Sequence, residues 1–375
     1  MTLILSGSDG VTFPDSTEQE TGYANGIGFR NRIINGDMRI DQRNAGAAVT
    51  VAAGGGYALD RFNVQSDLGS GSTMQRVAEA PEGFAYSQKL TIGTGATPTG
   101  SQFGRLIYYV EGQDCIDFDW TTASAKAVTL SFWTRSSLTG TFGVCLKLQA
   151  GSPYTSFFAS YTINSANTWE YKTITIPAAT MTAGTRSTTN GIGILVAWDL
   201  GEGPDRSTTA GYKASADGGT LGLTGGTKVF ATSGATWQIT GVQLEVGSVA
   251  TPFERRPYGT ELMLCQRYYQ QFDSANNAAS GAGFAGVCGT TAIAVVTGTY
   301  LVEMRAAPTV TFNNININYG GATSTVTALS SYASIRALGA DMTVTGTPLT
   351  IGRAAVVQFI GGASNSNRIA FSAEL

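Results

Sequence analysis

Ten short segments between residues 73 and 247 alternate apolar and polar side chains, and turn-rich stretches of hairpin length separate them. The segments are 73–78, 87–93, 102–112, 126–136, 141–149, 156–164, 169–177, 191–200, 228–234 and 237–247. A side-chain period of two predicts strands that bury one face. Closely spaced strands without a long helix between them favour antiparallel sheets packed face to face. We therefore expect an all-β protein built on an antiparallel sandwich.

The stretch 237–272 joins the last of these strands to the rest of the chain. Pro252 and Pro257 each fix φ and disfavour helix at the preceding residue, so the connector that contains them should be extended. Apolar residues then recur at three- and four-residue spacing up to Phe272, and Thr260 stands where an N-cap belongs. We expect a strand, an extended connector and a short helix in this order.

Small residues dominate from residue 273 onward, and further strand-like segments follow. They are 289–298, 299–308, 309–321, 341–346, 348–362 and 367–375. A domain of about a hundred residues with so many small side chains buries little apolar area by itself. We expect trimerisation about the helix and these strands to supply the missing burial, because closed symmetry is the usual arrangement of oligomers.

Charge and hydropathy argue against several partners. Only 13% of residues are charged, which suggests that part of the surface is buried against other copies of the chain. A net charge of −3 gives no electrostatic footprint for nucleic acid or an anionic membrane. The sequence has neither an apolar run of membrane-spanning length nor the pattern of a signal peptide, so we expect synthesis in a cytoplasm without membrane insertion.

The sequence contains no histidine. Catalytic Ser-His-Asp and Cys-His systems therefore cannot form, and the commonest ligand of catalytic zinc is missing. The four cysteines show no metal-binding spacing, and we expect buried free thiols at Cys115, Cys145, Cys265 and Cys288. No metal or cofactor is expected.

Residues 239–272, ITGVQLEVGSVATPFERRPYGTELMLCQRYYQQF, resemble a motif that recurs in phage and prophage tail fibre proteins with a jelly-roll, carbohydrate-binding-like domain. Within it, Arg255 stands where such proteins often have a histidine, so a titrating role is not expected there. Other parts of the chain resemble the same proteins, namely 31–44 (NRIINGDMRIDQRN), 57–62, 112–177 and 304–312 (MRAAPTVTF). Residues 10–17 (GVTFPDST) resemble a sequence near the attachment ends of phage structural proteins.

The resemblance implies a phage tail fibre or receptor-binding protein that adheres to host polysaccharide or lipopolysaccharide and is not an enzyme. It implies a homotrimer in the virion tail, held to other tail proteins through its N-terminal segment. The expected parts are an attachment segment 1–30, a jelly-roll domain 31–250, a linker with a trimerising helix 251–272, and a β-rich receptor-binding tip 273–375. Two alternatives stay open: a glycan-degrading hydrolase of the tailspike type, and a structural head or tail fibre that binds no receptor.

The acidic cluster at 111–119 is the one candidate for carboxylate chemistry. On a strand, Asp117 and Asp119 would share a face, as a glycosidase pair or a calcium site could require. Structural or solvent-facing carboxylates are the favoured interpretation. For Asp60 and Arg61, adjacent opposite charges favour a structural ion pair.

Sugar binding requires exposed aromatic faces beside polar groups, although most aromatics of a sandwich are buried in its core. Trp198 with Asp199, at the mouth of the loop 200–212, is the preferred ligand-facing pair. The other predicted binding residues are Trp120, Tyr154 and Tyr332. Strand alternation places Phe132 and Trp133 on opposite faces, one in the core and the other on the outside or in a subunit contact.

Overall fold

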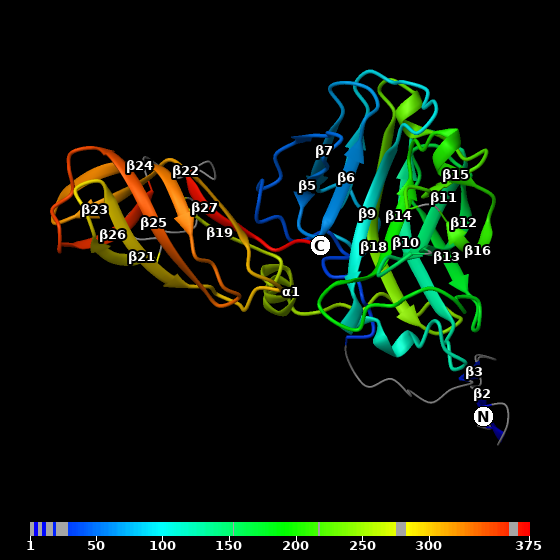
Figure 1. Cartoon of the computed structure of the whole chain (residues 1–375). Helices are drawn as coiled ribbons and strands as arrows, with labels where there is room; N and C mark the ends of the chain where they lie inside the picture. Colours follow the sequence, from blue (N-terminus) through cyan, green and yellow to red (C-terminus); the bar gives the residue numbers. More distant parts are fainter. Residues whose placement is uncertain are drawn as a thin grey trace.

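The computed structural model describes residues 4–6, 10–12, 18–19, 29–152, 154–216, 218–274, 283–359 and 367–375. It contains a large β-sandwich and a smaller β-barrel, with the only α-helix of these residues, α1 (Tyr258–Gln266), between them (Figure 1). Three short strands form a separate N-terminal sheet, β1 (Ile4–Ser6), β2 (Gly10–Thr12) and β3 (Glu18–Gln19). Most of the predicted attachment segment 1–30, including 13–17, lies outside the described residues.

The sandwich consists of two antiparallel sheets. The six-stranded sheet has the order β13 (Glu170–Ile176), β10 (Val128–Ser136), β18 (Thr236–Val246), β8 (Ser87–Thr91), β7 (Thr73–Val77) and β4 (Val49–Thr50). The seven-stranded sheet has the order β16 (Gly211–Ala216), β12 (Tyr154–Ile163), β11 (Gly140–Leu148), β14 (Ile192–Asp199), β9 (Gly104–Glu111), β6 (Phe62–Ser66) and β5 (Gly56–Leu59). The chain crosses repeatedly between the sheets, which confirms the predicted sandwich of jelly-roll type.

The sandwich core is continuous between the two sheets. Phe132 of β10 meets Trp198 of β14 edge to face, with ring centroids 5.8 Å apart. The outer face of the seven-stranded sheet is also covered, because Leu221 closes a second apolar cluster over Cys145 and Phe158. The covering segment contains η3 (Pro204–Arg206) and the parallel pair β15 (Ser207–Thr208) and β17 (Gly222–Leu223). Since that face is covered, a binding surface on the sandwich is more readily sought on the outer face of the six-stranded sheet.

The barrel closes in the order β20 (Ala285–Cys288), β21 (Ile293–Thr299), β25 (Ala337–Gly346), β24 (Ala322–Ser331), β23 (Ile315–Tyr319) and β26 (Ala354–Phe359). A three-stranded sheet of β19 (Tyr269–Asp273), β27 (Arg368–Ser372) and β22 (Thr309–Asn313) leads into it. Met342 and Val357 belong to a buried core that the barrel forms within one chain. Closure removes unpaired strand edges, so the barrel does not need a trimer to build its core.

Two predicted strands are wrong. Residues 228–234 form η4 (Val229–Ala231), because a 3-10 turn buries the adjacent Val229 and Phe230 together, whereas a strand would send them to opposite faces. Residues 300–308 belong to no strand. The Arg305 amide of this segment instead donates a hydrogen bond to the carbonyl of Arg267, the residue that directly follows α1. The described strands β20, β24, β5 and β6 were missed by the alternation pattern.

The predicted helix is too long and begins too late. Pro257, and not Thr260, occupies the N-cap position, where its carbonyl accepts from Glu261 at 3.0 Å. The helix ends at Gln266, and Tyr269–Asp273 pairs with β27 instead. Tyrosine and phenylalanine at helical spacing also suit a strand, and pairing with a distant segment decided between the two.

A backbone strap, which we define as residues 30–36, completes the six-stranded sheet. β8 pairs only with residues 236–239 of β18, so residues 242–244 would have an unpaired edge. There, the Arg32 amide donates to the Leu244 carbonyl at 2.9 Å and the Val242 amide donates to the Gly36 carbonyl at 2.9 Å. The Asn31 side chain fills the gap between these bonds, because its Oδ1 accepts from Leu244 and its Nδ2 donates to the Val242 carbonyl.

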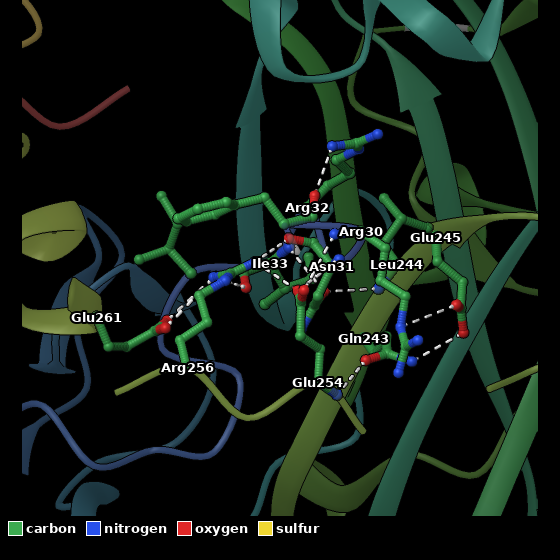
Figure 2. A network of polar contacts seen from close by, with 12 residues as sticks. Arg30, Asn31, Arg32, Ile33, Gln243, Leu244, Glu245, Glu254, Arg256 and Glu261 are labelled. Carbon is green, nitrogen blue, oxygen red and sulfur yellow. Dashed lines mark hydrogen bonds and ion pairs between the residues drawn. The ribbon is translucent and has the colours of Figure 1, made fainter. Parts of the chain in front are cut away.

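A polar network ties this strap to the connector before α1 (Figure 2). The Glu254 carboxylate accepts from the backbone amides of Arg30 and Asn31 at 3.3 and 3.0 Å. Arg256 donates to the Asn31 and Ile33 carbonyls and forms an ion pair with Glu261 at 3.3 Å. Two segments more than 200 positions apart in the sequence are thus joined through buried charged groups that satisfy one another.

Buried ion pairs also join the sandwich to the barrel. Glu374, which follows β27, accepts from Arg61 and from Arg43, the latter at 2.7 Å. Arg61 lies flat on Tyr268, with its guanidinium carbon 3.4 Å from the ring centroid. Asp60 contacts Arg43 at 3.6 Å rather than pairing with Arg61, which corrects the predicted pair. Burial raises the pKa of Asp60 to about 7, although Arg43 and Gln42 act in the opposite direction.

A further contact uses Arg267, which directly follows α1. Its Nε and Nη2 donate to the two Glu111 oxygens at 3.0 and 3.1 Å. Arg305 Nη1 donates to the Asn190 carbonyl at 2.8 Å and Asn190 Nδ2 donates back to the Arg305 carbonyl at 2.9 Å. These contacts hold the barrel against one end of the sandwich, and α1 packs through Cys265 with Ile34 and Ile40 of the same chain. The role of this helix in trimerisation stays a prediction.

The close approach of the strap to β18 requires glycine at position 36. A Cβ on Gly36 would overlap the Val242 carbonyl oxygen, whereas a Cβ on Gly54 meets nothing within 4 Å. We expect Gly36→Ala to reduce stability by about 1–3 kcal/mol and Gly54→Ala by less than about 0.5 kcal/mol. Calorimetric melting of both variants checks this, and equal melting temperatures would contradict the pairing of the strap with β18.

The ion pairs between sandwich and barrel predict that Glu374 contributes more to stability than Glu303, which also lies in the C-terminal part of the chain. Glu374→Gln leaves the buried Arg61 without its carboxylate and should cost about 3 kcal/mol or more. Glu303→Gln breaks the exposed pair with Arg336 and should cost less than about 1 kcal/mol. Thermal unfolding and limited proteolysis measure both effects. Equal behaviour of the two variants would show that the buried pair does not hold the barrel in place.

Candidate functional site

A pocket of about 450 Å³ that is lined by several aromatic side chains lies on the outer face of the six-stranded sheet. We call it the aromatic pocket, and its lining consists of Phe84, Trp133, Tyr171, Gly241, Ala250, Thr251, Pro252, Phe253 and Arg255. Three strands (β10, β13 and β18), the loop before β8, and the connector before α1 supply these residues. The pocket therefore exists only after segments far apart in the sequence have come together.

Strand register places the two largest rings side by side. Trp133 of β10 lies directly opposite Tyr171 of β13, and their ring centroids are 5.4 Å apart. Neighbouring Phe132 points into the core, so the two residues lie on opposite faces as predicted, and the structure makes Trp133 the outward one. Tyr171 is 42% exposed. Two adjacent rings on an open sheet face form an apolar platform with a hydroxyl at one side.

Gly241 forms the floor of the pocket at a bulge of β18. The register with β10 shifts between Ser131 and Trp133, and Gly241 adopts a φ of +63°. A Cβ there would lie 2.7 Å from the Phe84 ring and 3.1 Å from the Trp133 ring. Glycine is therefore required both for the backbone conformation and for the space that the two rings occupy.

The connector forms the opposite wall. Phe253 meets Phe84 edge to face at 5.2 Å. The Arg255 guanidinium lies over both rings, 4.8 Å from the Phe84 centroid and 5.7 Å from the Phe253 centroid. These contacts hold the cation at the rim of the pocket in a fixed orientation. Arg255 is the one charged residue among the described residues of the lining.

Three of the five predicted ligand-binding residues have almost no exposed surface. Trp198 is fully buried against Phe132, and Trp120 lies in the same core and donates through Nε1 to the Lys126 carbonyl at 3.2 Å. The Asp199 carboxylate is enclosed, where it accepts from Lys228 at 2.6 Å and from the Leu223 amide at 2.9 Å. In this conformation none of the three presents a face to a ligand.

Of the other two predicted residues, Tyr154 is partly buried on the sandwich and Tyr332 is exposed on the barrel. Tyr154, at the start of β12, packs beside the Lys147 ammonium, which lies 4.5 Å from its ring centroid. Tyr332, in the turn between β24 and β25, is 69% exposed and donates to Asp341 at 3.1 Å. The five residues thus do not form one site, and their role in binding stays a prediction.

The loop that was expected to present Trp198 and Asp199 does line a second pocket, of about 260 Å³. Glu202, Ser207 and Lys228 contribute polar groups to it, and Lys228 holds Asp199 beneath. Burial raises the pKa of Glu202 to about 8, opposed by Arg105, whose Nη1 lies 3.3 Å away. Asp199 thus lies close to a pocket, although its carboxylate faces inward.

The acidic cluster does not form a strand. Asp117 lies in η2 (Ile116–Phe118), and Asp119 follows it with a φ of +52°, so the two do not share a strand face. Asp117 pairs with Arg32 at 2.7 Å, and Asp119 pairs with Lys126 at 3.3 Å. These carboxylates therefore serve as structural ion pairs in this conformation.

The four cysteines are free and buried, as predicted. Among the residues placed by the structure, no three acidic or cysteine side chains are grouped so that they could hold a metal ion. In the same part of the chain, no helix has the length and hydropathy needed to cross a membrane.

Sequence reasoning placed Phe132 and Trp133 on opposite faces without deciding which of them points outward, and it missed the other rings of the aromatic pocket. Alternation in β13 could have identified Tyr171, because the core residues Ile174 and Ile176 stand on the opposite face of that strand. Phe84 and Phe253 come from segments without a period. Nothing in the sequence indicates that they meet over Gly241.

No protein-family model and no curated protein matches this chain. Solved structures with some similarity include the enzymatically active domain of tailspike protein 4 of bacteriophage CBA120, at 10% identity and a TM-score of 0.33 over 59% of this chain and 22% of that one. A family 11 carbohydrate-binding module of Clostridium thermocellum, in complex with a mixed-linked tetrasaccharide, shows 12% identity and a TM-score of 0.28 over 56% of this chain and 100% of the module.

The N-terminal cellulose-binding domain of Cellulomonas fimi β-1,4-glucanase C shows 13% identity and a TM-score of 0.29, over 50% of this chain and 90% of that domain. The matched part of this chain corresponds to about a fifth of the tailspike domain. These similarities are too remote to carry an argument about function, which must come from the residues themselves.

Proposed function

We propose that this chain is a glycan-binding adhesion protein that acts without catalysis. The observation that carries the proposal is the aromatic pocket, where Trp133 and Tyr171 stand side by side on an otherwise polar sheet face. The apolar face of a pyranose ring stacks on such a platform, and hydroxyl groups around the platform can bind the polar edge of the sugar. The pocket volume suits one or two sugar units of a longer chain.

We further propose that the protein is the receptor-binding fibre of a phage tail, directed at host polysaccharide or lipopolysaccharide. Support comes from the resemblance of residues 239–272 to phage tail fibre proteins. The same residues supply six members of the pocket lining, Gly241 and five residues between Ala250 and Arg255. The segment that suggests the virion role is thus also the segment that builds the proposed binding site.

We propose a homotrimer, because three weak sites on one particle reach useful avidity when they bind a repetitive polymer. Large apolar side chains are exposed around α1, where Tyr258 is 55% and Met263 is 52% exposed. Exposed apolar side chains on one side of a helix favour a contact with another copy of the chain. Attachment to other tail proteins through the N-terminal segment remains part of the proposal.

The glycan proposal predicts the effect of removing one ring. We expect Trp133→Ala, and separately Tyr171→Ala, to weaken binding of the full-length protein to host-surface polysaccharide about tenfold or more. Tyr332→Ala removes a ring from the barrel that is even more exposed, 69% against 42% for Tyr171, and should leave binding unchanged. Surface plasmon resonance on immobilised polysaccharide measures all three. If only Tyr332→Ala weakens binding, the receptor site lies in the barrel and the aromatic pocket is not the site.

The oligomer proposal predicts a change of mass. A charge on the exposed face of α1 should prevent burial of that face, so we expect Met263→Glu to yield monomers where the unmodified protein forms trimers. Ile351→Glu, at an exposed barrel turn, is the matched control and should remain trimeric. Analytical ultracentrifugation gives the masses. A monomeric unmodified protein would refute the homotrimer.

A further inference from the structure

Two adjacent arginines of the connector have opposite environments. Arg256 is buried, and its two terminal nitrogens contact Glu254, Glu261 and the carbonyls of the strap. Arg255 is exposed at the rim of the aromatic pocket. Among the described residues, no carboxylate oxygen lies within 4 Å of its guanidinium and no hydrogen bond satisfies it. Extended backbone accounts for the difference, because consecutive side chains point to opposite sides.

None of the acidic side chains of the connector or of the loop before β8 pairs with Arg255 within 4 Å, and Glu82 of that loop is exposed. Glu254 binds the strap and Arg256, and Glu79 pairs with Arg135. The pocket lining contains no carboxylate. The pocket thus combines an apolar platform with one positive charge that has no counter-charge within the described lining.

Stacking fixes the position of that charge. The guanidinium carbon lies 4.8 Å from the Phe84 ring centroid and 5.7 Å from the Phe253 ring centroid, and its N–H groups donate to no acceptor among the described residues, so they are available to a ligand. A planar guanidinium donates two parallel hydrogen bonds to a carboxylate, and such charge-assisted pairs are stronger than bonds between neutral groups. Because the rings hold the arginine in place, little conformational entropy is lost on binding.

We infer that the aromatic pocket selects an acidic saccharide, a sugar unit whose ring stacks on Trp133 and Tyr171 while its carboxylate pairs with Arg255. This inference rests on the proposed glycan binding and names its ligand class. A neutral sugar would satisfy the platform but leave the arginine unpaired. Phosphorylated sugars are also anions that a guanidinium binds through two hydrogen bonds, so the experiment distinguishes them from carboxylates.

The test compares each glycan with its uncharged form. The full-length protein is applied to an array of bacterial surface glycans, in which every uronic or nonulosonic acid glycan is printed beside its carboxyl methyl ester and a phosphorylated glycan set is included. We expect binding to the free acids to exceed binding to their esters about tenfold or more. Arg255→Gln should abolish this difference while leaving the weaker binding to the esters intact.

Arg336→Gln, which removes the same charge from an exposed position on the barrel, should retain the preference for free acids. Equal binding to acids and esters, or an acid preference that survives Arg255→Gln, overturns the inference and leaves the glycan-binding proposal standing. A preference for phosphorylated glycans alone overturns the assignment to a carboxylate. Absence of binding to every glycan overturns both the inference and the proposed function.

Discussion

The unpaired edge of β18 is the constraint on which the rest of the structure depends. A strand in the middle of a buried sheet cannot leave amides and carbonyls without partners, since each such group costs free energy. The strap supplies them, through the Arg32 amide, the Gly36 carbonyl and the side chain of Asn31. Once the strap is placed, Ile34 and Ile40 are in position to pack against α1, and the connector folds back over the sheet.

Two sets of contacts lead away from that edge, one toward the sheet face and one toward the barrel. Toward the sheet face, Glu254 and Gln243 fix the connector, so that Phe253 and Arg255 come to lie over the bulge at Gly241. Toward the barrel, Arg61 and Arg267 form buried or half-buried pairs with Glu374 and Glu111. Such pairs contribute little net stability compared with an apolar contact, but they penalise every arrangement that leaves a charge alone. They therefore determine orientation more than stability.

Much of the sandwich could be predicted because a period of two depends only on which face of a strand is buried. Strands β7 to β14 and β18 lie where alternation placed them. Prediction failed where the same residues suit two structures. Val229 and Phe230 fit either a strand or a 3-10 turn, and Tyr269 and Phe272 fit either a helix or a strand. In each case, contact with a segment far away in the sequence decided the outcome, and local pattern contains no information about that contact.

The proposed binding residues were likewise predictable only in part from the sequence. The sequence by itself determined that the chain is β-rich, has no histidine chemistry, and carries Trp133 and Phe132 on opposite faces, because these facts follow from composition and from side-chain alternation. Only the tertiary structure decided that Trp198 and Asp199 face inward while Trp133 and Tyr171 form a platform. It alone brought Phe84, Phe253 and Arg255 to that platform, since the strap, the bulge and the connector must all be in place before these side chains meet.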